Sequence, residues 1–277
     1  GEVYIAGGVE SMSRAPYAFS KNIGGGNLIA YDTALGWRFV NPRMEALYGT
    51  DPMGVTAENI AEMTGITRLE QDEFALASHQ RAVAAQDSGK FGEEILPVSV
   101  PQRKGDPVVV SQDERPRRDT SLEALSRLKP AFKPNGTVTA GNSSGLNDGA
   151  AAMLVMSAEK AHALGLKPMA RFISSAASGI EPRIMGLGPI EATRRALARA
   201  GLQIGDISLA EINEAFAVQT LAVMRELGLP HEITNVNGGA IALGHPLGCS
   251  GARILTTLLY EMRRRAPQEK RPFYGLA

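Results

Sequence analysis

The amino-acid sequence predicts an α/β protein: a mixed, mostly parallel sheet covered by helices on both faces, with an inserted loop domain. From residue 169 onward, stretches typical of strands alternate with amphipathic stretches typical of helices. Glycine is abundant, at 30 of 277 residues, which suits tight turns between strands and helices. Residues 14–136 interrupt this alternation. They include most of a long irregular stretch, residues 11–54, and irregular stretches of this length in a compact domain are usually functional.

Local signals predict the individual elements. The N-terminal half should contain a strand with its turn over residues 1–10, helices over residues 57–65 and 68–88, and edge strands within residues 95–110. Thr67 and Glu70 form a capping box at the start of the second helix. The C-terminal part should contain strands over residues 169–176, 208–212 and 233–237 and helices over residues 189–200, 214–227 and 251–265.

Charge and cysteine content exclude several classes of function. Lys+Arg and Asp+Glu balance at 29 each, so no long-range field favours nucleic acid or an anionic membrane, and neither partner is expected. No apolar run reaches the ~18 residues of a membrane span. The single cysteine, Cys249, excludes an internal disulfide and a cysteine-rich metal site. We therefore expect no metal and a cytoplasmic location.

A glycine-rich loop around His245 is the first candidate for chemistry. It lies between an expected strand and an expected helix, where ligands bind in parallel sheets. A neutral imidazole there deprotonates a thiol or polarises a carbonyl; the competing interpretation is a glycine-rich turn whose histidine caps a helix. A nicotinamide site is not expected, because His245-Pro246 stands where a dinucleotide fingerprint has a small residue.

Asn213 is the second candidate. It stands at the expected C-terminal end of a strand, where Asn usually caps a helix. The functional alternative is an amide that holds a water or a substrate oxygen.

A third motif, Gly141-Asn142-Ser143-Ser144-Gly145, fits a nucleophile elbow. Ser143, Asp206 and His245 follow the chain order of a serine hydrolase. Against that hypothesis, Asp206 precedes its expected strand, and a turn of small residues explains the motif equally well.

A basic stretch, residues 115–133, combines arginines and lysines with Leu128 and Phe132. It either forms a solvated face or holds phosphates and an apolar arm. Cys249 is expected to be a small buried thiol rather than a nucleophile, because it opens an apolar helix.

Taken together, the motifs resemble the thiolase family over essentially the whole chain. The matching segments are Ala6 to Ser13, Thr56 to Asn59, Gly141 to Ala151, Asn213 to Phe216 and Asn237 to Arg253. Residues 36–42 look most like degradative thiolases acting on β-ketoadipyl-CoA.

The resemblance implies acyl transfer through an acyl-cysteine, either thiolysis of 3-oxoacyl-CoA or condensation of two acetyl-CoA. His245 would activate the cysteine, and Asn213 would hold a water in the oxyanion hole. Ser144 would lie near the pantetheine amide and Arg117 at the nucleotide end, and the pantetheine tunnel would be lined by Leu128, Phe132, Met185 and Phe216. Coenzyme A and acyl-CoA would be substrates, no cofactor would be bound permanently, and the protein would be a homodimer or homotetramer.

The resemblance also implies a division of the chain. Residues 1–13 would be a remnant of the N-terminal domain, residues 14–136 an inserted CoA-binding loop domain, residues 137–168 the end of the N-terminal domain, and residues 169–277 an incomplete C-terminal domain. Neither family cysteine has a match, since Cys249 occupies a different position. We therefore expect a chain truncated at both ends and inactive alone. The alternatives are the serine hydrolase using Ser143 and a CoA-ester-binding module without catalysis.

Overall fold

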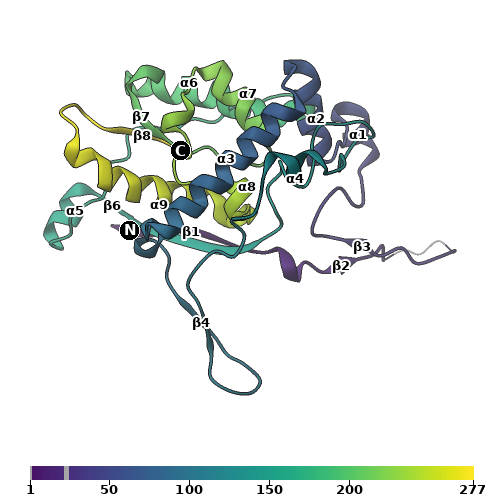
Figure 1. The fold of residues 1–277 in the computed structure, drawn as a ribbon, viewed down its shortest axis with the longest axis horizontal. Coiled ribbons are helices and arrows are strands. Elements are labelled where there is room, and N and C mark those ends of the chain that lie inside the picture. The colour runs from purple at the N-terminus through teal and green to yellow at the C-terminus, as the bar shows by residue number, and fades with distance from the viewer. Residues whose placement is uncertain (1, 22–24) are drawn as a thin grey trace.

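The computed structural model describes residues 2–21 and 25–277, and Figure 1 shows their layered arrangement. Gly1 and residues 22–24 lie outside the described residues. Gly1 belongs to the first expected strand, and residues 22–24 belong to the expected irregular stretch. Helix α9 (Leu247–Arg265) packs against the sheet of β1 (Val3–Ser11) and β6 (Asp148–Met156) and also contacts β7 (Ile207–Ala210) and β8 (Tyr274–Leu276). Helices α6 (Gly188–Ala200) and α7 (Ala217–Leu227) pack on each other beyond β7 and β8 (Figure 1).

The N-terminal half follows its local signals closely. The expected helices are α2 (Met53–Thr64) and α3 (Arg68–Asp87), and Thr67 and Glu70 make both hydrogen bonds of the capping box. Gly65 ends α2 in the left-handed conformation. The other helices of this half and its neighbourhood are α1 (Pro42–Tyr48), α4 (Leu122–Ser126) and α5 (Ala158–Ala163).

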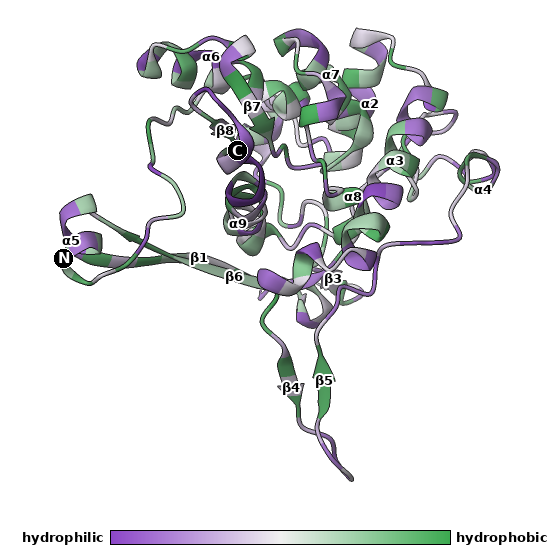
Figure 2. Cartoon of the chain, turned by 60° about the vertical axis from the view of Figure 1, so that its left-hand side comes forward, coloured by the Kyte–Doolittle hydropathy of each residue, from purple (hydrophilic) through white to green (hydrophobic). Residues whose placement is uncertain are grey.

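Two short antiparallel ribbons extend from the layers. One joins β2 (Tyr17–Ala18) to β3 (Tyr31–Asp32), and the other joins β4 (Val98–Val100) to β5 (Val108–Val110), as expected for residues 95–110. Figure 2 shows the second ribbon projecting away from the body with apolar strands. Its cross-strand pairs place Val98, Val100, Val108 and Val110 on one exposed face.

The strands and their pairing differ from the expected mostly parallel sheet. Among the described residues, β7 and β8 pair in parallel, whereas β1–β6, β2–β3 and β4–β5 are antiparallel. The strand expected over residues 169–176 is absent there, because this segment lies along α6: Ser174 donates to the Ala196 carbonyl, and Arg199 donates to the Ser175 carbonyl. The strand expected over residues 233–237 is a turn, with only an isolated bridge between Thr234 and Ala210.

Helix starts also shift by a few residues. Helix α7 begins at Ala217 rather than residue 214, because the preceding residues pair with the Gly141–Gly145 loop. Helix α9 begins at Leu247, directly after Pro246, and not at residue 251. Gly201 and Gly228 end α6 and α7 in the left-handed conformation.

Helix α7 connects the two apolar clusters of the core. One face contributes Ala217, Val223 and Leu227 to a cluster with β7 and α3, and the other contributes Val218 and Ala222 to a cluster with α2. Of the helices that the structure describes, none combines the length and apolarity that crossing a bilayer requires.

Glu58 fastens α2 to the segment that leads into the Gly141–Gly145 loop. Its buried carboxylate accepts from the backbone N–H groups of Thr137 and Val138 and from the Thr137 hydroxyl, at 2.8–3.1 Å. Backbone donors paired with a buried carboxylate make strong hydrogen bonds that are costly to lose.

A second buried carboxyl, Glu211, follows β7. Its Oε2 lies 3.8 Å from Nη1 of Arg253, and neither of its oxygens has a hydrogen-bond partner among the described residues. Burial raises the pKa of Glu211 from 4.5 to about 8, although the charge of Arg253 opposes this shift. Burial likewise raises the pKa of Glu94 to about 7, against a hydrogen bond from Thr257 and the charge of Arg253. Both groups therefore bind a proton more tightly in the folded chain.

We predict that Glu58→Gln lowers the free energy of unfolding by about 1–3 kcal/mol, because an amide cannot accept from all of these donors. Chemical denaturation of the 277-residue chain measures this difference. The matched control is Glu62→Gln one turn along the same helix, where an exposed ion pair with Lys133 is lost and less than about 1 kcal/mol is expected. Equal effects of the two substitutions would contradict the role of Glu58.

We also predict that stability falls as pH rises from about 6.5 to 8, which lies above the range where the histidines with lowered pKa values make stability rise with pH. Between pH 4.5 and their folded pKa values, Glu211 and Glu94 hold protons that the unfolded chain has lost, so each contributes a negative slope of at most about 1.4 kcal/mol per pH unit. Denaturation at a series of pH values measures the slope. Glu211→Gln should flatten it, whereas substitution of the exposed Glu226 should not; an unchanged slope in Glu211→Gln would refute the assignment.

Candidate active site

Asn213 and His245 meet between β7 and α9. Asn213 stands in the loop after β7, and His245 lies between α8 (Ala240–Leu243) and α9. The Asn213 Nδ2 atom is 3.4 Å from His245 Nε2. Both residues are half-buried, and the Asn213 Oδ1 atom has no partner among the described residues. The amide oxygen of Asn213 thus remains without a partner beside the imidazole of His245.

Ser250 contacts the second ring nitrogen of His245. Its Oγ lies 2.6 Å from His245 Nδ1 and also donates to the Pro246 carbonyl, at 3.1 Å. With its hydroxyl proton directed to the Pro246 carbonyl, the Ser250 oxygen is placed to accept from Nδ1–H, and we infer this tautomer for His245. The Nε2 lone pair of His245 therefore faces Asn213.

The surroundings of His245 favour the neutral ring. Burial lowers the pKa of His245, and the charge of Arg253 lowers it further. A neutral imidazole with its lone pair on Nε2 accepts a proton from a thiol or, once protonated, donates to an oxyanion.

Asn235 holds the backbone that carries Asn213. Its Oδ1 accepts from Ile212 N at 2.7 Å, and its Nδ2 donates to the Ile212 carbonyl at 2.8 Å. Asn235 is buried and has a positive φ of 47°, a conformation that asparagine tolerates better than most residues. Its Nδ2 also donates to Glu214 Oε1, at 2.8 Å.

Glu214 then connects this loop to the loop of His245. Its buried Oε2 accepts from the Ser78 hydroxyl at 2.7 Å and from Ile241 N at 3.1 Å. Ser78 Oγ in turn accepts from Gly239 N. A side chain on Gly239 would collide with the Glu214 carboxylate, since a Cβ there would lie 2.2 Å from its Cδ. The two loops are therefore fixed by one buried polar network.

The Gly141–Gly145 loop lies beside the residues after Asn213. Ser144 N donates to the Ala215 carbonyl at 3.0 Å, and Ser143 forms an isolated bridge with Phe216. His245 N approaches the Gly145 carbonyl, at 3.4 Å. Ser144 thus lies on a loop that contacts the loops of both Asn213 and His245.

The described residues do not assemble the serine-hydrolase triad. Ser143 is buried, and its hydroxyl donates to the Thr139 carbonyl at 2.6 Å. Asp206 accepts from Gln203 N, at 2.8 Å, and the ring nitrogens of His245 face Asn213 and Ser250. Ser143 therefore supports the loop and does not contact the histidine.

Two of the apolar residues expected to line a tunnel are in contact. The rings of Phe132 and Phe216 meet edge to face, with centroids 6.0 Å apart. Leu128 lies against Gly141, and Met185 is placed in the 3-10 segment Pro182–Leu187; both are partly exposed.

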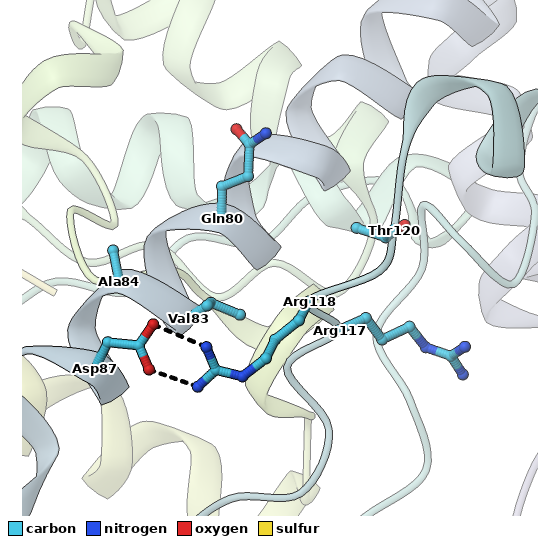
Figure 3. A pocket seen from close by; sticks show the side chains of 7 residues that line it. All are labelled: Gln80, Val83, Ala84, Asp87, Arg117, Arg118 and Thr120. Atoms are coloured by element: carbon cyan, nitrogen blue, oxygen red, sulfur yellow. Dashed lines mark hydrogen bonds and ion pairs between the residues drawn. The ribbon is translucent and has the colours of Figure 1, made fainter.

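Arg117 lies beside α3, where its backbone N–H donates to His79 Nδ1. It lines a surface pocket of about 250 Å³ whose other residues are Gln80, Val83, Ala84, Asp87, Arg118 and Thr120. In Figure 3 its side chain points away from the ion pair between Arg118 and Asp87.

Cys249 is buried in the first turn of α9, as expected for a structural thiol. Burial raises its pKa, so the reactive thiolate is disfavoured. Sequence reasoning missed Ser250, Asn235 and Glu214. A hydroxyl in the first turn after Pro246 was a usable signal for Ser250, whereas Asn235 contacts a segment distant in the sequence.

Two descriptions of one known family match this chain. The family described as "Thiolase, N-terminal domain" matches residues 1–159, and "Thiolase, C-terminal domain" matches residues 166–270. The chain is 54% identical to a β-ketoadipyl-CoA thiolase of Acinetobacter baylyi, covering 94% of this chain and 66% of that protein. It is also 54% identical to the 3-oxoadipyl-CoA/3-oxo-5,6-dehydrosuberyl-CoA thiolase of Escherichia coli K12, covering 96% and 67%.

Solved structures agree as well. The acetyl-CoA acetyltransferase of Bacillus anthracis superposes with a TM-score of 0.87 at 45% identity, covering 96% of this chain and 66% of that one. Human mitochondrial 3-ketoacyl-CoA thiolase in complex with CoA gives 0.86 at 44% identity, covering 96% and 65%. This chain thus spans about two thirds of the length of these relatives. It has the α/β fold of the thiolases, and it belongs to the thiolase family.

Proposed function

We propose that the whole protein is an acyl-CoA acyltransferase that cleaves 3-oxoacyl-CoA with CoA, or condenses two acetyl-CoA in reverse. The observation that carries this proposal is the contact of Asn213 Nδ2 with His245 Nε2, while Ser250 occupies Nδ1. This arrangement offers a base and a polar cradle for one thioester oxygen.

The proposed chemistry has two half-reactions. His245 Nε2 takes the proton of a cysteine thiol, and the thiolate adds to the substrate carbonyl carbon. Negative charge develops on the carbonyl oxygen, where the protonated Nε2 and a water held by Asn213 donate to it. Collapse of this adduct breaks the C2–C3 bond of the substrate, and acetyl-CoA leaves as a carbanion that takes the proton from His245 Nε2, while the shortened acyl group stays on the cysteine. In the second half-reaction His245 takes the proton of the free CoA thiol, the CoA thiolate adds to the acyl-cysteine carbonyl, and the departing cysteine thiolate takes that proton back.

The nucleophile in this proposal is not Cys249. That thiol is buried with a raised pKa, and it is the one cysteine of the sequence. We therefore propose that the 277-residue chain alone forms no acyl-enzyme and that the reaction requires the whole protein.

We infer that residues 14–136 hold much of the CoA molecule. Phe132 and Phe216, already in contact, would flank the pantetheine arm with Leu128 and Met185, and Ser144 would face its amide. Arg117, beside the pocket on α3, would meet the nucleotide phosphates. No permanently bound cofactor is part of this proposal.

For the acyl group we propose β-ketoadipyl-CoA or a similar 3-oxoacyl chain. The names of the two 54% identical relatives support this choice, as does the resemblance of residues 36–42 to degradative thiolases. We also propose a cytoplasmic homo-oligomer: the exposed valine face of the β4–β5 ribbon suits burial in a subunit contact.

The proposal predicts that His245→Ala in the whole protein lowers the turnover of 3-oxoacyl-CoA by about 10²–10⁴-fold without changing the fold. Steady-state thiolysis assays with circular dichroism measure both effects. Substitution of His162, an exposed histidine of α5, is the matched control and should leave turnover within about a factor of two. A His245→Ala enzyme that also stayed within that range would refute the assigned role.

Calorimetric titration with CoA distinguishes the proposed enzyme from the remaining alternative, a CoA-ester-binding module. If the unsubstituted whole protein binds CoA but turns over no 3-oxoacyl-CoA, it is a binding module without catalysis.

A further inference from the structure

Arg115 is a cation without an ion-pair partner on the segment that packs against the loop beside His245. It is half-buried, and its Nε atom is enclosed without a hydrogen-bond partner. Within residues 2–21 and 25–277, no ion pair or hydrogen bond of its guanidinium is found. Because arginine stays protonated, this charge must be balanced by solvent or by an anionic ligand.

The guanidinium lies beside the histidine loop. A Cβ atom on Gly145 would be only 2.1 Å from both Cζ and Nη2 of Arg115, so the guanidinium packs directly on the Gly145 main chain. The carbonyl of the same glycine faces His245 N, at 3.4 Å. One residue therefore separates the unpaired charge from the backbone of His245.

The backbone on either side of Arg115 is anchored to α3. Arg117 N donates to His79 Nδ1 at 3.1 Å, and Arg118 forms a bidentate ion pair with Asp87 (Figure 3). Burial, followed by the charges of Arg117 and Arg115, lowers the pKa of His79 to about 4, so its ring is neutral and able to accept.

Two charges of the same chain segment act on Arg115. Burial lowers the pKa of Arg115 first and the charge of Arg117 lowers it further, whereas Glu114, its neighbour in the chain, opposes this shift. None of these groups forms an ion pair with the guanidinium, so a carboxylate ligand can still approach it.

We infer that Arg115 binds the terminal carboxylate of a dicarboxylic 3-oxoacyl-CoA and so selects acyl chains that end in a negative charge. This inference rests on the proposed function. Its guanidinium packs on Gly145 next to the backbone of His245, whereas Arg117 lines the pocket beside α3, so Arg115 is the arginine nearer the site of acyl transfer. The planar guanidinium matches a carboxylate with two parallel hydrogen bonds.

The test compares two esters of the same length in the whole protein: 3-oxoadipyl-CoA, which ends in a carboxylate, and 3-oxohexanoyl-CoA, which ends in a methyl group. We expect the unsubstituted enzyme to prefer the carboxylate in kcat/KM. Arg115→Gln should reduce that preference by about tenfold or more, mainly through KM, as the loss of a charged hydrogen bond does. Arg115→Lys, which keeps the charge, should retain an intermediate preference.

Two controls make the outcome specific. Arg117→Gln should weaken both esters in parallel, and Arg171→Gln, at an exposed position outside residues 14–136, should change neither. A parallel loss for both esters in Arg115→Gln would overturn the inference, because it would place Arg115 on the shared CoA portion. Absence of turnover with either ester in the unsubstituted enzyme would instead overturn the proposed function.

Discussion

The buried carboxylate of Glu214 is the interaction on which the site depends. A charge taken out of water is tolerable only when several donors surround it. Here those donors are the Ser78 hydroxyl, the Asn235 amide and the N–H of Ile241, which come from α3 and from the two chain segments that follow β7 and precede α9. Burial raises the pKa of Glu214, while these hydrogen bonds oppose the shift, so the loss of any of them would disfavour the buried carboxylate. The carboxylate therefore fixes the two loops relative to each other.

This constraint explains why the chemistry of the site is available before any ligand arrives. Asn235 forms hydrogen bonds with both backbone groups of Ile212, which hold the backbone directly before Asn213. The helix after His245 supplies Ser250, which keeps the imidazole proton on Nδ1. Helix α3 serves as the common support, because it carries Ser78 and also His79, which holds the backbone of Arg117. Preorganised donors of this kind need no rearrangement during reaction.

The sequence predicted the elements whose signals are local and missed those that depend on distant partners. The capping box of Thr67 and Glu70 and the glycine after α6 were visible in short windows, and both predictions are confirmed. The strand expected at 169–176 is wrong, because β propensity does not show whether a neighbouring strand exists. Arginine side chains of α6 donate instead to the backbone carbonyls of Ser175 and of Ala177 just beyond the segment. His245 and Asn213 were found through motifs. Glu214, Asn235 and Arg115 were not, since their roles arise from contacts across more than twenty residues of chain.

The central claim is that His245 is neutral, with its proton on Nδ1 and its Nε2 lone pair facing Asn213. Nitrogen-15 NMR of the histidine rings in the 277-residue chain at neutral pH tests it most directly. The account predicts a protonated Nδ1 and an unprotonated Nε2 for His245, with this preference weakened when Ser250 is replaced by alanine. A proton on Nε2, or a doubly protonated ring at neutral pH, would contradict it.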